Sequence, residues 1–328
     1  MNNKSLILRT LAGSGDEYIS GTRLAKAAGV SRNAVWKTVQ ALSAEGFLID
    51  AVRNKGYRLS PENNHFSGEI ITAGLDTSVY GRSLHIHDCV SSTNELAKKL
   101  AGEGAADGTA IIADSQSSGK GRLGRSFVSP SGTGIYLSLI IRPRFGIDAA
   151  QLITSCAACA AAEAVEELCG KPAAIKWVND LWMNGKKICG ILTEASLSLE
   201  TRSLDYAVIG IGINVLSVKD IFSGDLGDIA SSIEDEAGIK ISRNRLCSVL
   251  LNRLEKRISQ LPDRDFLDEY RRRELLTGNI ITAGTGIRQL TGKAIGIDDN
   301  AGLVIRLEDG SLTTISSGEA NLCRIKSV

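Results

Sequence analysis

The sequence has no long hydrophobic run, only three histidines, and cysteines at irregular spacings. No apolar stretch approaches the roughly 20 residues that a membrane-spanning helix needs. The N-terminus also lacks an uninterrupted signal-peptide core. We therefore expect a cytoplasmic protein with no membrane partner. Seven cysteines, an odd number, argue against a disulfide framework in such a protein.

Two short motifs that could bind a metal are incomplete. Cys156-x-x-Cys159 lies in an alanine-rich, helix-forming run, and no second cysteine pair follows at ligand spacing. We interpret these two residues as small buried helix positions. His85 and His87 share a strand face, but no third ligand accompanies them. We expect no metal site built from protein ligands alone.

The rest of the composition is that of a globular protein with one basic end. The 328 residues are 43% hydrophobic and 23% charged, which suffices for two or three domains. The formal net charge of +1 hides an asymmetry, because residues 1–60 hold nine Lys/Arg against four Asp/Glu. This end, at +5, is suited to an anionic partner, whereas the remainder carries −4.

Residues 1–62 have the pattern of a winged helix-turn-helix. A short helix is predicted over residues 22–28, a Gly-Val turn follows, and Ser31 caps a second helix that ends near residue 44. Two short strands around a basic turn at residues 53–56 then predict a wing.

The second helix has one apolar face and one face suited to the major groove. Val35, Val39 and Leu42 fall at core spacing, which leaves polar and basic side chains on the other side. A small helical domain whose basic face binds nothing is the alternative. The predicted DNA-binding residues are Thr22, Ser31, Arg32, Asn33, Trp36, Lys37, Gln40, Arg53 and Lys55.

The stretch from Gly119 to Gly124 has the G-x-G-x-x-G spacing of a dinucleotide-binding loop without its context. Such a loop follows a strand, opens a helix and precedes an acidic residue about 20 positions later. Here polar residues precede it, a Ser-Pro-Ser-Gly cluster follows, and residues 139–144 contain no carboxylate. We interpret it as a flexible loop whose three cations close around a polyanion; a solvated surface loop is the alternative.

Residues 63–277 alternate predicted helices with buried strands. Ser92 and Glu95 form a capping box, which would place Ser92, Thr93 and Asn94 at a helix N-terminus that can bind a polar group. Gly210 and Gly212 share one strand face, which suggests backbone packed against something flat. The predicted strands are 110–113, 134–141 and 207–214, and a long helix is predicted over 149–168.

Asn184-Gly185 is a strong signal for a two-residue hairpin between apolar-rich strands. We expect this hairpin to bring four polar residues together: Lys176, Asn179, Asp180 and Lys187. Lys187 starts an otherwise buried strand, where an ammonium group is costly unless it meets an anion. Plain surface charge on Lys186 and Lys187 is the alternative.

Five motifs, in order, resemble the biotin-protein ligases. They are Ser91-Ser92-Thr93-Asn94, Gln116-x-x-Gly119-Lys120-Gly121-Arg122-x-x-Arg125, Lys176-Trp177-x-Asn179-Asp180, Lys187-x-x-Gly190-Ile191-Leu192 and Gly210-Ile211-Gly212-Ile213-Asn214. With the helix-turn-helix in front, the whole chain resembles the bifunctional ligases that also repress the biotin operon. It departs from them at Lys120, where the family has Arg and its bidentate fork, and at Val178, where the family has Pro.

The resemblance implies an enzyme that activates biotin with Mg-ATP to biotinyl-5'-adenylate and then transfers biotin to one lysine of a biotin carboxyl carrier domain. Because an anionic carboxylate meets an anionic phosphate, catalysis must be mostly electrostatic. The implied catalytic residues are Lys187, Arg122 and Arg125, and the magnesium would come with ATP, near Asp180. The adenylate would also act as corepressor, favouring a homodimer on operator DNA.

The other implied contacts divide by ligand. Those with biotin are Ser92, Thr93, Asn94, Gln116, Gly119, Lys120, Gly121, Arg122, Lys187, Gly210 and Gly212. Within this group, the ureido ring would bond to Ser92, Thr93 and Gln116 and lie over the two strand glycines. Those with the nucleotide are Arg122, Arg125, Phe127, Lys176, Asn179, Asp180, Lys187 and Asn214.

Residues 278–328 predict short strands with turns at 298–302 and 309–310. The resemblance implies an SH3-like barrel there, and we assign it no residue-level chemistry. The expected fold is thus α+β and multidomain: a winged helix-turn-helix at 1–62, a class II synthetase-like α/β ligase domain with a mixed sheet at 63–277, and the barrel. A ligand-sensing repressor without catalysis and a lipoate ligase-like acyltransferase remain alternatives. Lys187 and the paired arginines argue against the first, and the glycine-arginine loop against the second.

Overall fold

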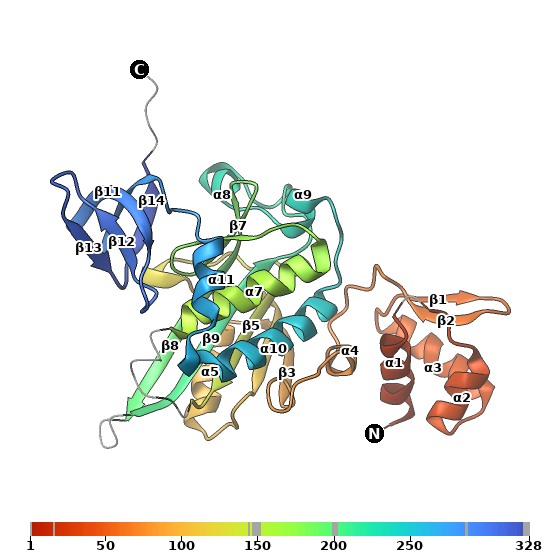
Figure 1. Cartoon of the computed structure of the whole chain (residues 1–328). Coiled ribbons are helices and arrows are strands. Elements are labelled where there is room, and N and C mark those ends of the chain that lie inside the picture. The colour runs from red at the N-terminus through yellow and green to blue at the C-terminus, as the bar shows by residue number, and fades with distance from the viewer. Residues whose placement is uncertain are drawn as a thin grey trace.

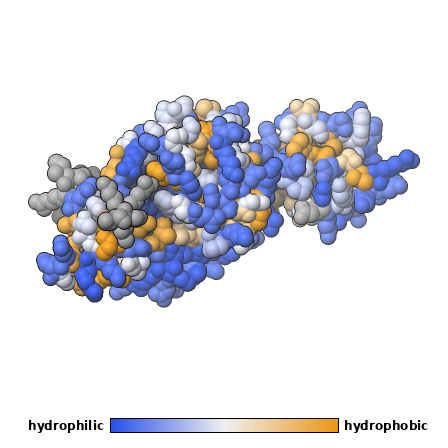
Figure 2. Space-filling view, turned by 90° about the horizontal axis from the view of Figure 1, so that it is seen from above, coloured by the Kyte–Doolittle hydropathy of each residue, from blue (hydrophilic) through white to orange (hydrophobic). Residues whose placement is uncertain are grey.

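The fold contains three separate sheets. The computed structural model describes residues 2–15, 17–143, 145, 152–198, 203–285 and 288–323. A two-stranded sheet lies near the N-terminus, a seven-stranded sheet in the middle and a five-stranded sheet near the C-terminus (Figure 1). The N-terminal module is a distinct lobe joined to the rest over a narrow contact, which the view from above in Figure 2 also shows.

The N-terminal lobe is a helix-turn-helix with a wing, as predicted. It comprises α1 (Asn3–Gly13), α2 (Gly21–Ala28), α3 (Arg32–Ala44), β1 (Ile49–Val52) and β2 (Gly56–Leu59). The Ser31 hydroxyl caps α3 by accepting from the Ala34 amide at 3.1 Å, and Gly29 turns the chain with a φ of 64°. The sequence analysis named no helix over α1, whose inner face supplies Ile7, Leu8 and Leu11 to the core of this lobe.

The central sheet is mixed. Its order is β3 (Leu84–Val90), β4 (Ala110–Gln116), β5 (Gly134–Ile141), β9 (Ser203–Asn214), β8 (Lys186–Ser198), β7 (Asp180–Met183) and β6 (Ala174–Lys176). β3 and β4 pair in parallel, and the other neighbours pair antiparallel.

Helices cover both faces of this sheet, in keeping with β5, which is buried at every position. On one face α5 (Thr93–Gly102) packs Ala97 and Ala101 against Ile111 and Ile140. On the other lie α7 (Ile153–Cys169), α10 (Arg243–Ser259) and α11 (Phe266–Arg273). The shorter elements are α4 (Gly68–Ala73), η1 (Arg122–Gly124), α8 (Gly224–Ile229), α9 (Ile233–Ala237) and η2 (Leu261–Asp263). Within the described residues, no helix is long and apolar enough to cross a bilayer.

Cys156 and Cys159 are fully buried on α7, as interpreted from the sequence. Burial raises the pKa of the Cys156 thiol to about 12, because the thiolate would lose its hydration. Of the predicted long helix, residues 149–151 lie outside the described part of the chain.

Two local predictions were wrong. Strand β4 continues through Asp114 to Gln116, so the glycine loop does follow a strand, although η1 and not an α-helix comes next. Ser92 precedes α5, but its hydroxyl makes no capping bond. The predicted hairpin at Asn184-Gly185 is confirmed, since β7 and β8 flank it; before it, β6 and β7 are joined by a turn in which the Trp177–Val178 peptide bond is cis.

The C-terminal sheet has the order β13 (Leu312–Ile315), β12 (Leu303–Arg306), β11 (Arg288–Ile297), β10 (Ile280–Thr285) and β14 (Glu319–Leu322). In the described residues, β13 and β14 do not pair with each other, so the sheet is not a closed barrel. The predicted SH3-like barrel is therefore not confirmed. The Trp177 indole donates to Ala301 O at 2.9 Å and fixes this sheet beside the central one.

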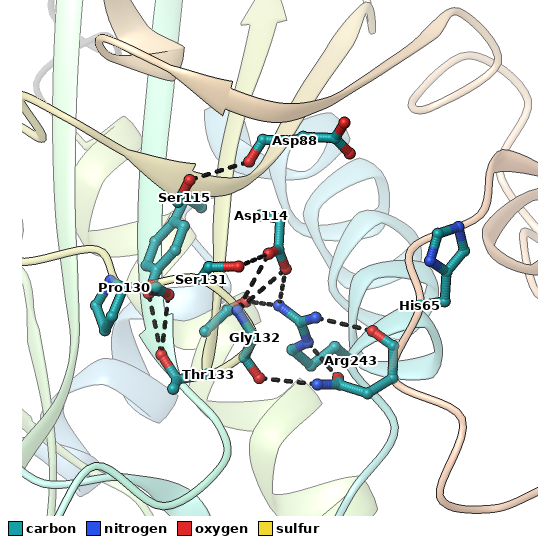
Figure 3. A network of polar contacts seen from close by, with 12 residues as sticks. His65, Asp88, Asp114, Ser115, Pro130, Ser131, Gly132, Thr133 and Arg243 are labelled. Atoms are coloured by element: carbon teal, nitrogen blue, oxygen red, sulfur yellow. Dashed lines mark hydrogen bonds and ion pairs between the residues drawn. The ribbon is translucent and has the colours of Figure 1, made fainter. Parts of the chain in front are cut away.

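A buried arginine ties the segment after the wing to the middle of the chain (Figure 3). Arg243, the first residue of α10, donates to Asp114 Oδ1 at 2.7 Å, Gly134 O at 2.9 Å and Asn64 O at 2.8 Å. The Asn64 amide in turn donates to Gly132 O at 2.8 Å. The network thus holds residue 64 against the turn that leads from the glycine loop into β5. Farther out, the Ser5 hydroxyl on α1 donates to Glu69 Oε1 on α4 at 2.8 Å.

Candidate functional site

One cleft collects nearly all the predicted ligand-binding residues. The space within it, open mouth included, is about 940 Å³. The central sheet forms its floor, the glycine loop forms one wall, and the C-terminal sheet closes one end. Its predicted members are Ser92, Thr93, Asn94, Gln116, Lys120, Gly121, Arg122, Arg125, Phe127, Lys176, Asn179, Asp180, Lys187, Gly210 and Gly212.

Two predicted residues lie outside the lining. A Cβ on Gly119 would meet Phe127 O at 2.3 Å, so this glycine permits the close return of its own loop. Asn214 ends β9 and is buried, and its amide donates to Ser231 O at 2.9 Å.

The glycine loop folds back on itself as a tight arch. Gly121 N donates to Arg125 O at 2.7 Å, and Phe127 N donates to Gly119 O at 2.8 Å. Leu123, at the tip, has a φ of 54° and is 66% exposed. The arch directs its cations toward the cleft, where Arg122 Nη1 reaches Asn179 Oδ1 at 2.9 Å.

Lys187 meets its anion inside the protein. Its Nζ lies 2.7 Å from Asp180 Oδ2 across the Asn184-Gly185 hairpin, whose two residues have φ values of 48° and 81° as a type I′ turn requires. The Asp180 carboxylate is only half satisfied, because Oδ1 is buried and has no hydrogen-bond partner among the described residues. A ligand with cationic or metal-bound groups would find an acceptor there.

Lys176 is a third cation in this end of the cleft. Its ammonium lies 5.2 Å from the centre of the Trp182 ring and donates to Asn321 Oδ1 at 2.7 Å. Burial lowers its pKa, because desolvation disfavours the charged form, and Lys187 adds repulsion while Asp180 opposes it. The clustered positive charge suits a phosphate-bearing ligand.

The C-terminal sheet supplies three residues that the sequence analysis missed. Gly318 O accepts from Arg122 Nη2 at 3.0 Å, Glu319 Oε2 accepts from Arg125 at 2.6 Å, and Asn321 bonds Lys176. These contacts span more than a hundred residues of sequence, so no local spacing could have revealed them.

The other end of the cleft is lined by uncharged polar groups. Thr93 N donates to Gln116 Oε1 at 2.9 Å, and Gln116 Nε2 donates to Ser129 Oγ at 2.8 Å. Lys120 reaches Glu95 at 2.5 Å, an ion pair that links the glycine loop to α5.

The two strand glycines are required by protein side chains. A Cβ on Gly210 would lie 2.0 Å from Asn94 Oδ1, and one on Gly212 would lie 2.5 Å from the Phe127 ring. The flat group that the sequence predicted against Gly212 is therefore an aromatic ring of the glycine loop, and that against Gly210 is an amide.

The described residues contain no group of three or more His, Cys, Asp or Glu side chains that could hold a metal. Asp180, with its unpartnered Oδ1, is the carboxylate in the cleft that fits a magnesium ion whose other ligands come from phosphate and water.

The predicted DNA-binding residues form an exposed surface on the N-terminal lobe. Arg32, Asn33, Lys37 and Gln40 are exposed on α3, and Trp36 is 51% exposed beside them. Thr22, Ser31, Arg53 and Lys55 are exposed as well. Val35, Val39 and Leu42 are buried, so the predicted faces of this helix are confirmed.

Comparison with known proteins agrees with this architecture. The model of the biotin/lipoate A/B protein ligase family matches residues 86–214, that of an HTH domain residues 3–58, and that of the biotin protein ligase C terminal domain residues 277–322. The chain is 38% identical over 310 residues to the bifunctional ligase/repressor BirA of Bacillus subtilis, covering 93% of this chain and 94% of that protein. To BirA of Escherichia coli it is 30% identical, covering 93% of each.

Among solved structures, the biotin protein ligase from Aquifex aeolicus in complex with biotin and ATP is similar, with a TM-score of 0.63 and 29% identity. The match covers 74% of this chain and 99% of that one. The chain therefore belongs to the biotin protein ligase family, among its bifunctional ligase/repressor members.

Proposed function

We propose that this protein is an ATP-dependent biotin-protein ligase that also acts as a biotin-responsive transcriptional repressor. It forms biotinyl-5'-adenylate and then transfers biotin to a lysine of a biotin carboxyl carrier domain. The observation that carries the ligase half is the cleft itself, in which Arg122, Arg125, Lys176 and Lys187 converge beside a neutral, polar pocket.

The charge distribution fits the first reaction. A carboxylate and an α-phosphate repel each other in water, and fixed cations in a partly enclosed cleft offset that repulsion. Lys187 and Arg122 line the cleft beside Asp180 and Asn179, and we assign them to the reacting carboxylate and α-phosphate. Arg125, Lys176 and Asn179 hold the rest of the nucleotide, and Phe127 packs beside it. Asn214 supports this site from outside the lining, because its amide fixes the chain at Ser231.

Lys187 forms an ion pair with Asp180, and this contact must change when the nucleotide binds. When phosphate enters, the Lys187 ammonium turns toward it from Asp180 Oδ2, and Asp180, whose Oδ1 has no partner among the described residues, would hold the magnesium ion that accompanies ATP. Magnesium, when bound, screens phosphate charge. Arg122 and Arg125 exchange their carbonyl and carboxylate partners on the C-terminal sheet for phosphate oxygens in the same way.

The neutral end takes biotin. Ser92, Thr93 and Gln116 face the ureido ring. Lys120 and Gly121 cover the ring from the glycine loop. Gly210 leaves room for the Asn94 side chain next to the strand. The two remaining glycines, 119 and 212, allow the loop to close and Phe127 to lie flat against the sheet.

The repressor half rests on the N-terminal lobe. An exposed basic face on α3 and a basic wing turn fit the major groove and the adjacent phosphates. We propose that the adenylate favours a homodimer that presents two such lobes to a palindromic operator. We also propose domain boundaries at residues 62/63 and 277/278, an SH3-like character for the C-terminal module, and action in the cytoplasm.

The ligase half is tested by Lys187→Ala with pyrophosphate release as the readout. Loss of one charge contact in the transition state should slow adenylate formation by about a hundredfold. Lys186→Ala is the matched control, because Lys186 bonds the carbonyls of Gly227 and Asp228 outside the cleft. Near-normal release by Lys187→Ala would remove this lysine from the reaction.

A further inference from the structure

A chain of buried hydrogen bonds runs behind the neutral end of the cleft. The Asn94 amide donates to Glu194 Oε2 at 2.9 Å and to Leu192 O at 3.3 Å. On its other side, Asn94 Oδ1 lies 2.6 Å from the Ser138 hydroxyl, which lies 2.8 Å from the Thr93 hydroxyl. Ser138, Thr93 and Asn94 are each at least 95% buried.

The direction of this chain is fixed by counting donors and acceptors. Glu194 Oε2 and Leu192 O both accept, so the nitrogen of Asn94 must face them and its oxygen must face Ser138. Ser138 has a single proton and gives it to Asn94. The Thr93 hydroxyl then has one proton for its two neighbours, Ser138 and Gln116 Oε1.

Thr93 therefore has no proton left for a ligand. Its hydroxyl oxygen also lies 3.2 Å from Gln116 Oε1, which already accepts from Thr93 N. Whether the Thr93 proton goes to Ser138 or to Gln116, the oxygens of Thr93 and Gln116 offer a ligand only lone pairs at the cleft wall. A bound group that offers an N–H to them relieves this arrangement, whereas an ether oxygen or a sulfur atom does not.

Glu194 keeps its accepting role through a second contact. Lys98 on α5 donates to Glu194 Oε1 at 2.8 Å and to Glu95 Oε1 at 2.9 Å. Burial acts to lower the pKa of Lys98, but the bonds from both carboxylates outweigh it and the pKa is raised, so the ammonium stays charged. Glu194 itself does not line the cleft.

We infer that Glu194 is a positioning residue that sets ligand specificity, because it orients Asn94 and, through Ser138, makes Thr93 an obligate acceptor for an N–H of the ligand head. This inference rests on the proposed binding of biotin, whose cyclic urea carries two N–H groups. It also explains why Asn94, predicted as a direct contact, has both ends of its amide committed within the protein.

The test compares isosteric ligands on the intact chain. Desthiobiotin retains the cyclic urea, and its two cyclic carbamate analogues each replace one ring N–H by oxygen. Calorimetry should show that the unmodified protein binds the urea about a hundredfold more tightly than at least one carbamate. In Glu194→Met this ratio should fall by about tenfold, the effect of one hydrogen bond, because only the longer bond to Leu192 O still orients the Asn94 amide.

The control is Glu163→Gln, which breaks a part-buried ion pair to Arg257 between α7 and α10 and should leave the ratio unchanged. Lys98→Met on α5 should also lower the ratio of urea to carbamate affinity. This variant takes the place of Glu194→Met if the latter does not fold. An equal loss of affinity for urea and carbamate in both variants, or no discrimination by the unmodified protein, overturns the inference and leaves the ligase function intact. Failure of the unmodified protein to bind desthiobiotin and biotin overturns both.

Discussion

Replacing Arg243 by methionine removes the charged centre of the network in Figure 3. The Arg243 side chain is 3% exposed and also lies over the Phe66 ring, 4.2 Å from its centre. Methionine retains much of the apolar packing but removes every bond to Asp114, Gly134 and Asn64. The Asp114 carboxylate, whose side chain is only 25% exposed, thereby loses its cationic partner.

The substitution should lower the free energy of unfolding. Removal of one partner of a buried ion pair typically costs about 3 to 5 kcal/mol. Asp114 keeps the Ser131 hydroxyl and the Gly132 amide at 3.1 Å, so we expect the lower end, about 3 kcal/mol at pH 7.

The cost should depend on pH. Burial acts to raise the pKa of Asp114, but the bonds from Ser131 and Arg243 outweigh it and the pKa is lowered. A lowered pKa contributes stability that is fully present above the unfolded value of 3.8 and is lost as pH falls through the folded pKa. Arg243→Met removes the contribution of Arg243 to this lowering, so the pKa of Asp114 should be higher in the variant, and protonation of Asp114 should relieve the variant at a higher pH than the unmodified protein. The difference in stability should therefore narrow by about 1 kcal/mol at pH 4.

Urea denaturation at pH 7 and pH 4 measures both effects. Arg253→Met on the same helix is the control, because Arg253 and Glu167 form an exposed pair and its loss should cost under about 1 kcal/mol. A cost for Arg243→Met below about 1 kcal/mol at pH 7, or one that is equal at both pH values, would refute the reasoning.

Three further predictions concern the loop and the N-terminal lobe. Trypsin should cut after Arg122 or Arg125 in the free protein and be blocked by biotin with ATP; equal cutting in both states would count against loop closure. Operator binding, measured by gel shift, should weaken at least tenfold between 50 and 200 mM salt because α3 and the wing displace counterions, and a flat response would exclude phosphate contacts. A chain beginning at residue 63 should lose operator binding and retain biotin transfer. Its melting temperature should be lower, because α4 loses its contact with α1. Loss of transfer in a truncated chain that still folds would show that the N-terminal lobe contributes to the site.

The features that the sequence predicted well are those with local causes. Ser31 and Gly29 define the helix-turn-helix through a cap and a left-handed turn, and Asn184-Gly185 defines the hairpin, so each needs only a few neighbouring residues. The hairpin then places Lys187 beside Asp180 without any distant contact.

The features that it missed depend on distant segments. Thr93 N bonds Gln116 in place of a helix cap, and the flat partner of Gly212 is Phe127, nearly ninety residues earlier. Glu319 and Gly318 reach the arginines of the glycine loop from the other end of the chain. No periodicity or short motif encodes such pairings, since they arise only once the sheets pack.

The central claim is that one chain couples biotin activation to carrier modification. Mass spectrometry of a biotin carboxyl carrier domain, incubated with the full chain, biotin and ATP, tests it most directly. We predict the addition of one biotin to a single lysine, dependent on ATP and slowed by about a hundredfold in Lys187→Ala. An unmodified carrier under these conditions, or equally efficient transfer of lipoate, would contradict the account.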